Sequence, residues 1–365
     1  MSTMTQMRIR LARPDDLDAI FNLACMAGPG MTTLKPDRPA LQARLQTAQD
    51  TVAGTAPLCE QDYLFVLEDM GCRRVVGLSA IKAAVGLDQP FYSFWLGTLV
   101  HASREIGIVN QFETMTISND MTGAAELCSL FLLPQYRTGN NGRLLSKCRL
   151  LFLSMFAERF PVRVMAEMRG YRRADGVVPF WDGFMRTFFG MAFDKADNLT
   201  SEGKKAFIAE LMPRYPIYST LLPETVRDVI GKVHPDTAPA RRLLEQEGLC
   251  YEGYIDIFDG GPQLHANIAS LRAARELQSF RARVGDTPGG DGDSWLVANP
   301  DLQQFSVIVT DHNPSQGRLC LSRAEAVALG VGSDAAVAGI RLNPQPARPA
   351  PRPPVSFHHE SVEYA

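Results

Sequence analysis

The segment AAELCSLFLLP (124–134) is followed by the loop QYRTGNNG (135–142) and then by RLLSKCRLLFLSMFAERF (143–160). The first segment is mostly apolar and ends at a proline, which is typical of a buried strand. In the third segment, apolar residues stand at offsets of 0, 1, 4, 7, 8, 11 and 12 from Leu144, which predicts a helix with one buried face. The loop therefore joins a buried strand to the first turn of a long helix.

The loop between Arg137 and Arg143 is suited to bind a phosphate group. Its two glycines and two asparagines permit unusual φ values, so consecutive backbone N–H groups can point into one hollow. The dipole of the following helix adds positive potential there, which favours a pyrophosphate. An ordinary strand-to-helix turn with a solvated basic face would use the same residue types, and the loop alone leaves both interpretations open. The residues that would form the phosphate site are Arg137, Gly139, Asn141, Gly142 and Arg143, and we expect Lys147, four residues after Arg143 on the polar helix face, to assist with a further phosphate.

Shorter strand and helix patterns flank this unit on both sides. The alternation at 7–11 predicts a strand, and the runs at 62–69 and 73–81 predict an antiparallel hairpin. Between them, an amphipathic pattern predicts a helix that ends at Gly28. Further short strands are predicted at 90–95, 112–118 and 162–168.

Composition and motif spacing exclude several classes of protein and of site. Among 365 residues the formal net charge is 37 − 40 = −3, which disfavours nucleic-acid binding through broad electrostatic attraction. No window approaches 18 uninterrupted apolar residues and no signal peptide is visible, so we expect a cytoplasmic protein that is not in a membrane. The seven cysteines are scattered and form no CxxC or Cys/His cluster with zinc spacing, so reduced thiols and no metal site are expected. No Lys-Ser or Lys-Thr follows the last glycine of the loop, which excludes a Walker P-loop, and the Rossmann glycine pattern is absent.

The order of elements around the loop resembles that of the acyl-CoA N-acyltransferase (GNAT-like) superfamily. A short strand, a helix, a hairpin and an apolar strand precede the pattern Arg-x-x-x-x-Gly-x-Leu-Leu, which opens a helix. The resemblance implies an α+β fold of mixed, mostly antiparallel sheets flanked by helices and arranged in two lobes. It also implies that the loop holds the pyrophosphate of coenzyme A and that the preceding strand pairs with the pantetheine arm. One departure is Asn140, which stands where the superfamily usually has glycine.

A narrower resemblance is to the arginine N-succinyltransferase family. The matching segments include ELCSLFL (126–132), GRLLSKCR (142–149), AEMRG (166–170), FIAELMP (207–213), VIGKVHPDTAPA (229–240) and YIDIFDGGP (254–262). The resemblance implies transfer of a succinyl group from succinyl-CoA to the α-amine of L-arginine, the first step of succinyl-dependent arginine catabolism. Succinyl-CoA would be a co-substrate, and no permanently bound cofactor is expected. Two alternatives remain: the same fold acting on ornithine or another amine, and a non-catalytic paralogous subunit of a heteromeric succinyltransferase.

The resemblance also implies roles for two individual residues. His234 matches the proton-donor histidine of the family, although a His-Pro pair by itself is typical of an exposed turn. His101 is the second candidate for the proton donor on residue type alone, and a buried hydrogen-bonded role is its alternative. Leu130 matches a family position associated with succinyl-CoA, where its backbone would meet the pantetheine amides.

A cationic acceptor requires carboxylates for its guanidinium group and a cation for its α-carboxylate. The candidates that lie in or beside matching segments are Glu126, Glu167, Arg169 and Asp182, with Asp256 as a further carboxylate. The expected partners are thus L-arginine and succinyl-CoA, together with a second copy or a paralogous subunit. We expect an acyl-CoA-binding lobe (1–175), a second lobe that contributes His234 (176–280), a small strand-rich region (281–343) and a Pro-rich disordered tail (344–365).

Overall fold

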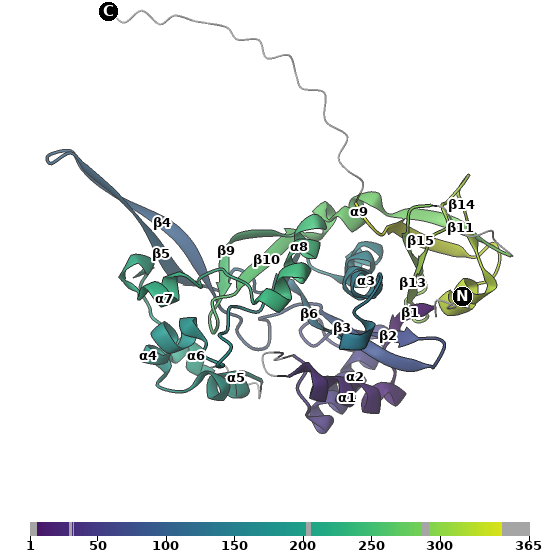
Figure 1. Cartoon of the computed structure of the whole chain (residues 1–365), viewed down its shortest axis with the longest axis horizontal. Helices are drawn as coiled ribbons and strands as arrows, with labels where there is room; N and C mark the ends of the chain where they lie inside the picture. The colour runs from purple at the N-terminus through teal and green to yellow at the C-terminus, as the bar shows by residue number, and fades with distance from the viewer. Residues whose placement is uncertain (1–5, 29–30, 32, 202–205, 286–291, 345–365) are drawn as a thin grey trace, which may run out of the picture.

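The computed structural model describes residues 6–28, 31, 33–201, 206–285 and 292–344, and within them a single mixed sheet of 15 strands runs through the molecule (Figure 1). Its strand order is β14-β11-β15-β12-β13-β1-β2-β3-β6-β7-β10-β9-β4-β5-β8. The pairs β6–β7 and β11–β14 are parallel and the other pairs are antiparallel, so the predicted α+β class with mostly antiparallel pairing is confirmed. The strands are β1 (Met7–Leu11), β2 (Asp62–Asp69), β3 (Arg74–Lys82), β4 (Ser93–Ser103), β5 (Ile108–Ser118), β6 (Ala125–Leu132), β7 (Arg163–Glu167), β8 (Ile217–Tyr218), β9 (Cys250–Asp256), β10 (Pro262–Asn267), β11 (Gln278–Val284), β12 (Trp295–Asn299), β13 (Ser306–Thr310), β14 (Arg318–Leu321) and β15 (Ala336–Arg341).

Helices cover both faces of the central strands. In Figure 1, α1 and α2 lie below β2, β3 and β6, and α3 lies above them. The order β1, α1, α2, β2, β3, β6, α3 and β7 includes each element that the superfamily resemblance required. No helix in the described part of the chain has the length and apolarity that a bilayer span requires. The helices are α1 (Leu17–Ala27), α2 (Arg38–Ala53), α3 (Asn141–Met155), α4 (Arg186–Phe189), α5 (Phe193–Ser201), α6 (Ala206–Leu211), α7 (Glu224–Arg227), α8 (Ala238–Gln246), α9 (Arg272–Glu276) and α10 (Arg323–Leu329).

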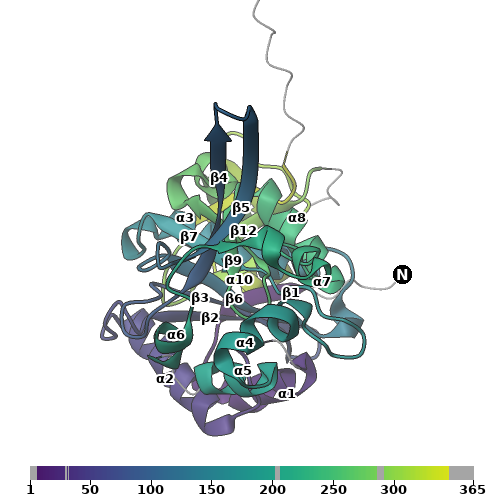
Figure 2. The same ribbon diagram turned by 90° about the vertical axis from the view of Figure 1, so that its left-hand side faces the viewer.

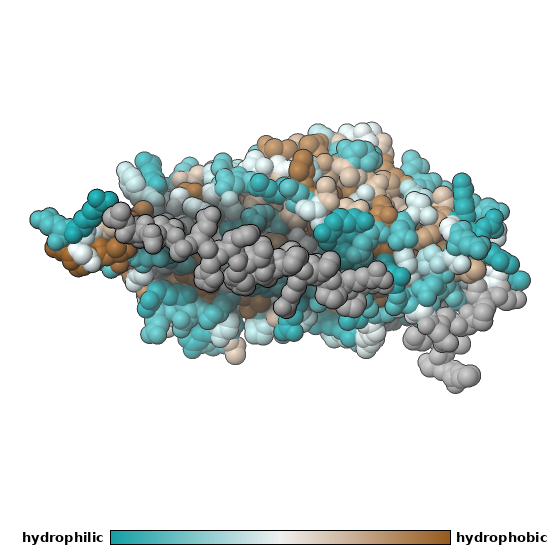
Figure 3. All heavy atoms as spheres, turned by 90° about the horizontal axis from the view of Figure 1, so that it is seen from above, coloured by the Kyte–Doolittle hydropathy of each residue, from teal (hydrophilic) through white to brown (hydrophobic). Residues whose placement is uncertain are grey.

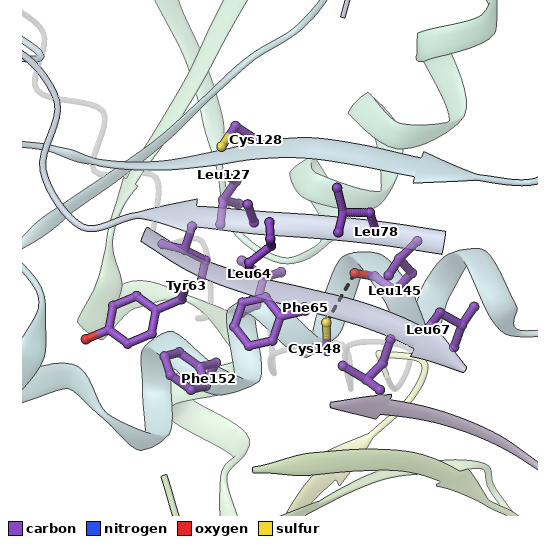
Figure 4. Close-up of a cluster of buried hydrophobic side chains, with 14 of the residues drawn as sticks. Tyr63, Leu64, Phe65, Leu67, Leu78, Leu127, Cys128, Leu145, Cys148 and Phe152 are labelled. Carbon is purple, nitrogen blue, oxygen red and sulfur yellow. Dashed lines mark hydrogen bonds between the residues drawn. The ribbon is translucent and has the colours of Figure 1, made fainter. Parts of the chain in front are cut away.

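The main core lies where β2, β3 and β6 meet α3 (Figure 4). Every residue of β2 is buried, because helices cover the sheet on both sides here. Phe152 of α3 packs edge-on against Phe65 of β2 and against Phe305, with ring centroids 5.1 and 4.8 Å away. Burial of this apolar stripe fixes the position of α3, and therefore of the loop that precedes it.

A second core joins the base of the β4–β5 hairpin to residues 178–257. Phe94 and Met115 come from that hairpin, although they precede the boundary expected at residue 175. Conversely, the first core extends to Leu342, so neither core divides at that boundary. The reason is the continuous sheet, since β9 and β10 return from the second half and pair beside β7.

Residues 278–342 add β11–β15 and α10 with a small core of their own. The tail predicted from 344 falls almost wholly outside the described residues.

The β4–β5 hairpin projects as a long two-stranded arm from the body of the molecule (Figures 1 and 2). The two short strands predicted from the sequence at 90–95 and 112–118 are parts of this arm, which runs from Ser93 to Ser118. Near its tip, Val100, Ile106 and Val109 are 57%, 67% and 71% exposed, and apolar surface is visible there in Figure 3. Such a ribbon has little core of its own.

Candidate active site

The central cleft opens where β6 and β7 separate. These parallel strands share the register pairs Ala125↔Val164 and Glu126↔Met165, after which β6 continues to Leu132 without β7 beside it. A cleft of about 1510 Å³ occupies the resulting gap and extends to the loop before α3. Of the site residues predicted from the sequence, those that line this cleft are Glu126, Leu130, Arg137, Gly139, Gly142, Arg143, Glu167, Arg169 and Asp256.

A β-bulge shapes β6 inside the cleft. Leu78 faces Phe131 and Ala80 faces Cys128, so Ser129 and Leu130 together oppose a single residue of β3. Ser129 has a φ of 54°, and its hydroxyl accepts a hydrogen bond from the Arg44 guanidinium at 3.0 Å. The bulge turns backbone polar groups beside Leu130 out of the β3–β6 ladder, where they can face a ligand.

The loop before α3 forms an open hollow at the mouth of the cleft. Gly139 has a φ of +55°, and an added Cβ at Gly139 or Gly142 would meet no atom within 4 Å. Asn140 precedes the helix without donating or accepting a side-chain capping bond, which leaves the first-turn N–H groups available to an anion. The Asn141 side chain does not line the cleft but donates to the Tyr136 carbonyl at 3.0 Å, so it holds the loop in shape.

Lys147, which stands on α3 four residues after Arg143, is unavailable to a phosphate. Its side chain is 2% exposed and its Nζ forms an ion pair with Glu247 Oε1 at 2.7 Å. Burial lowers the pKa of Lys147. The expectation that its ammonium group assists Arg143 on a polar helix face is therefore wrong, because that face is covered by α8 and the segment after it.

His234 lies behind the rim of the cleft rather than on its lining. Its backbone N–H donates to the Arg169 carbonyl at 2.8 Å, and Val233 forms a β-bridge with Gly170. The three residues that follow, 235–237, do line the cleft. The His234 side chain is 18% exposed, and its Nδ1 accepts a hydrogen bond from the Asp236 N–H at 3.2 Å. This contact leaves Nε2 as the nitrogen with the transferable proton.

Three carboxylates gather on the cleft wall formed by the ends of β7 and β9. Asp256 accepts from the Phe258 and Asp259 N–H groups, and Asp259 accepts from the Gly170 and Gly261 N–H groups, at 2.7–2.8 Å. Burial, followed by the charges of Asp259 and Glu167, raises the pKa of Asp256 well above its ordinary value. Burial also raises the pKa of Asp259. A cation bound here would therefore be favoured, because it offsets the burial and mutual repulsion that raise these pKa values.

Glycine makes this carboxylate wall possible. An added Cβ at Gly261 would lie 2.1 Å from the Met168 carbonyl, so this position accepts no larger residue without movement of the backbone. The close approach brings the segment after β7 against the turn between β9 and β10.

The opposite wall carries cations and a neutral thiol. Lys82 of β3 pairs with Glu126 of β6 in the sheet. Burial alone would lower the pKa of Lys82, but the negative charges of Glu126 and Asp62 outweigh burial and raise it. Burial raises the pKa of the Cys128 thiol to about 11. Cys128 is therefore protonated near neutral pH, which supports its interpretation as a core thiol rather than an acyl carrier.

Two predicted residues lie away from the cleft. Asp182 is exposed, and its carboxylate accepts from the Val178 N–H at 3.2 Å, as expected for a residue that stabilises the start of a helical turn. His101 is on the exposed β4–β5 arm, where Nε2 lies 3.3 Å from the Tyr218 hydroxyl, so the buried role expected for it is wrong. Neither position favours contact with a substrate in the cleft.

Comparison with known proteins finds relatives over most of the chain. The family model described as "Arginine N-succinyltransferase beta subunit" matches residues 7–273. A relative called arginine N-succinyltransferase, from Yersinia enterocolitica serotype O:8 / biotype 1B, is 47% identical over 326 residues, which cover 89% of this chain and 94% of the relative. A protein of the same name from Escherichia coli O17:K52:H18 is 45% identical over 336 residues, with coverage of 92% and 98%.

A solved structure shares the fold over nearly the whole chain. It is the arginine/ornithine succinyltransferase subunit AI from Pseudomonas aeruginosa, which is 34% identical and superposes with a TM-score of 0.84. The similarity covers 93% of this chain and 100% of that one. The likeness therefore includes the cleft as well as strands β11–β15.

Proposed function

The chain belongs to the arginine N-succinyltransferase family and is an acyltransferase that uses arginine and an acyl-CoA, and on this premise we propose that it transfers succinyl from succinyl-CoA to the α-amine of L-arginine by direct attack. The observation that carries the proposal is one cleft with an anion-binding loop at its mouth and a carboxylate wall inside it. The hollow at Gly139 and Gly142 suits the pyrophosphate of coenzyme A. The carboxylate wall suits a guanidinium group.

In the proposed reaction, the neutral α-amine attacks the thioester carbon, the C–S bond breaks, and coenzyme A leaves as a thiol. A backbone N–H beside the Ser129 bulge stabilises the oxyanion of the tetrahedral intermediate. His234 acts as an imidazolium, which delivers its Nε2 proton to the departing sulfur and becomes the neutral ring. In that imidazolium the Nδ1 proton replaces the hydrogen bond from the Asp236 N–H and faces the Asp236 carboxylate, whose Oδ2 lies 3.7 Å away. Glu126 accepts the proton of the amine through water.

An assay of free coenzyme A released from succinyl-CoA, with and without arginine, tests this function. We expect thiol release that depends on arginine and a product whose α-amine carries the succinyl group. Release at the same rate without arginine would contradict transfer to an amino acid.

Ornithine is the second candidate acceptor, because the name of the Pseudomonas aeruginosa relative includes both amino acids. Ornithine has an ammonium group where arginine has a planar guanidinium, which can form two parallel hydrogen bonds with a carboxylate. The pair of half-buried carboxyls at Asp256 and Asp259 favours the guanidinium. A higher kcat/KM for ornithine than for arginine would reverse this assignment.

Gly142 offers a test of the phosphate site that leaves the fold intact. Replacing Gly142 by alanine should keep or slightly raise stability, because alanine favours the first turn of α3 by about 0.5–1 kcal/mol over glycine. The added methyl group would occupy the hollow, so affinity for coenzyme A should fall roughly tenfold, about 1.4 kcal/mol. Gly332→Ala is the matched control, since a Cβ there is also unobstructed but far from the cleft. Equal coenzyme A affinity in both variants, measured by calorimetry, would place the phosphate elsewhere.

The carboxylate wall predicts that arginine binding releases a proton. A bound guanidinium lowers the raised pKa of the Asp256–Asp259 pair, so arginine affinity should increase with pH, by up to about tenfold per pH unit below that pKa. Calorimetry in two buffers with different ionisation enthalpies measures the protons released. In Asp256→Asn the release should disappear, and a release that persists unchanged would assign it to another group.

We also propose that the protein acts in the cytoplasm and assembles into a homodimer or with a paralogous subunit. All seven cysteines are free thiols, as a reducing compartment requires. The apolar tip of the β4–β5 arm supports an assembly. The mass of the chain alone in solution would distinguish a homodimer from a monomer that awaits a different partner.

A further inference from the structure

Arg149 of α3 is a buried cation on the lining of the cleft. Arg149 is only 2% exposed, and its side chain is one of the largest that are fully buried among the described residues. Three hydrogen bonds hold the guanidinium: Nε to the Ser146 carbonyl at 3.2 Å, one terminal nitrogen to the Ser146 hydroxyl at 3.2 Å, and the other to the Cys128 carbonyl at 3.4 Å. A guanidinium has five N–H donors, so two remain for a ligand.

The charge of Arg149 has no carboxylate within ion-pair distance among the residues that the structure describes. Its acceptors are a hydroxyl and two carbonyls, and the adjacent Cys128 and Cys148 thiols stay protonated because burial raises their pKa values to about 11 and about 12. Burial lowers the pKa of Arg149 itself. An enclosed charge without a counter-ion is costly, and proteins usually pair it. An anion from a ligand would supply the missing partner.

The position of Arg149 along the cleft indicates which anion this is. Gly142 marks the phosphate loop at the mouth, and seven residues of helix place Arg149 about 10 Å further along α3. There it contacts the Cys128 carbonyl, one residue before the bulge at Ser129 and two residues after Glu126, where β6 and β7 converge. We call the point where β6 and β7 converge the closed end of the cleft. Arg149 lies towards this end, away from the phosphate groups of a bound coenzyme.

Succinyl-CoA carries negative charge on its phosphates and on the free carboxylate of its succinyl group. With the phosphates at the mouth and the thioester beside Leu130, the anion at the closed end is that carboxylate. We infer that Arg149 binds the terminal carboxylate of the succinyl group and so selects succinyl-CoA over acyl donors without that charge. This inference rests on the proposed function, because it assumes that the donor is a succinyl thioester.

Arg149→Gln tests the inference when each variant is assayed with succinyl-CoA and with butyryl-CoA, which has a methyl group in place of the carboxylate. Loss of a buried charged partner should lower kcat/KM for succinyl-CoA about 100-fold. The kcat/KM for butyryl-CoA and the KM for arginine should change less than about threefold. Selectivity between the donors, rather than activity alone, is the quantity that distinguishes binding of the carboxylate from support of the fold.

Lys82→Gln is the comparison variant, because Lys82 is another cation that lines the same cleft. It should keep the preference for succinyl-CoA. Loss of that preference in Lys82→Gln but not in Arg149→Gln would overturn the inference and assign the carboxylate to Lys82. An equal loss with both donors in Arg149→Gln would also overturn it, since Arg149 would then only support α3 against β6. Absence of succinyl transfer in the wild-type protein would instead contradict the proposed function, so the two failures are distinguishable.

Discussion

His234→Ala is expected to lower kcat about 1,000-fold with succinyl-CoA and arginine, within the roughly 10²–10⁴-fold that a general acid contributes. Without a proton donor, the thiolate must leave as an anion from a cleft with a buried interior. Affinity for coenzyme A should change less than about twofold, because the loop before α3 and strand β6, which would bind it, are separate from the segment that carries His234. Steady-state kinetics together with calorimetric titration of coenzyme A separates these two effects.

The geometry around His234 makes this test specific. Its backbone N–H is bonded to the Arg169 carbonyl, and the side chain is partly exposed, so removal of the imidazole leaves no large internal cavity. His101→Ala is the matched control, since that histidine is on the β4–β5 arm and should retain wild-type kcat. If His234→Ala also keeps wild-type kcat over the full pH range, the proton must come from another group.

The parts of the site that the sequence predicted are those fixed by local periodicity. The apolar run of β6, the loop with Gly139 and Gly142, and the helical repeat from Leu144 each specify a conformation over a few residues. Once these three elements follow one another, a strand-to-helix loop at the start of α3 follows from their order, and phosphate binding by that loop stays a prediction. The structure therefore places the predicted loop residues near the cleft, with Asn141 as a supporting residue of the loop.

The parts that the sequence did not reveal depend on contacts between distant segments. The sequence gives no local sign that Lys147 pairs with Glu247, one hundred residues later, or that Arg149 lacks a counter-ion. The sequence likewise predicts no helix at α2, because the buried Leu41, Leu45 and Ala48 are separated by polar residues in a weak pattern. It predicts two short strands in place of the β4–β5 arm, since the apolar residues at the tip of the arm follow no simple alternation.

Glu247→Gln is expected to destabilise the protein by about 3–5 kcal/mol, because it leaves the buried Lys147 without its anion and leaves Arg272 with Glu276 alone. Glu247 is fully buried and lies 2.7 Å from Lys147 Nζ and 3.0 Å from a terminal nitrogen of Arg272. Lys147 also donates to the Leu342 carbonyl, and Arg272 to the Arg341 carbonyl, so the network joins α3, α8, α9 and the end of β15. Urea unfolding monitored by circular dichroism measures the loss.

The pH dependence of the variant identifies the cause of that loss. Burial already lowers the pKa of Lys147 from its ordinary value, and loss of the carboxylate should lower it further. Between the folded and unfolded pKa values, the unfolded chain then binds more protons, so the stability of Glu247→Gln should rise with pH. Glu245→Gln, which removes an exposed partner of Arg241, should cost less than about 0.5 kcal/mol at any pH. A deficit in Glu247→Gln that stays constant as pH rises would mean that lost packing, rather than the uncompensated charge of Lys147, destabilises the protein.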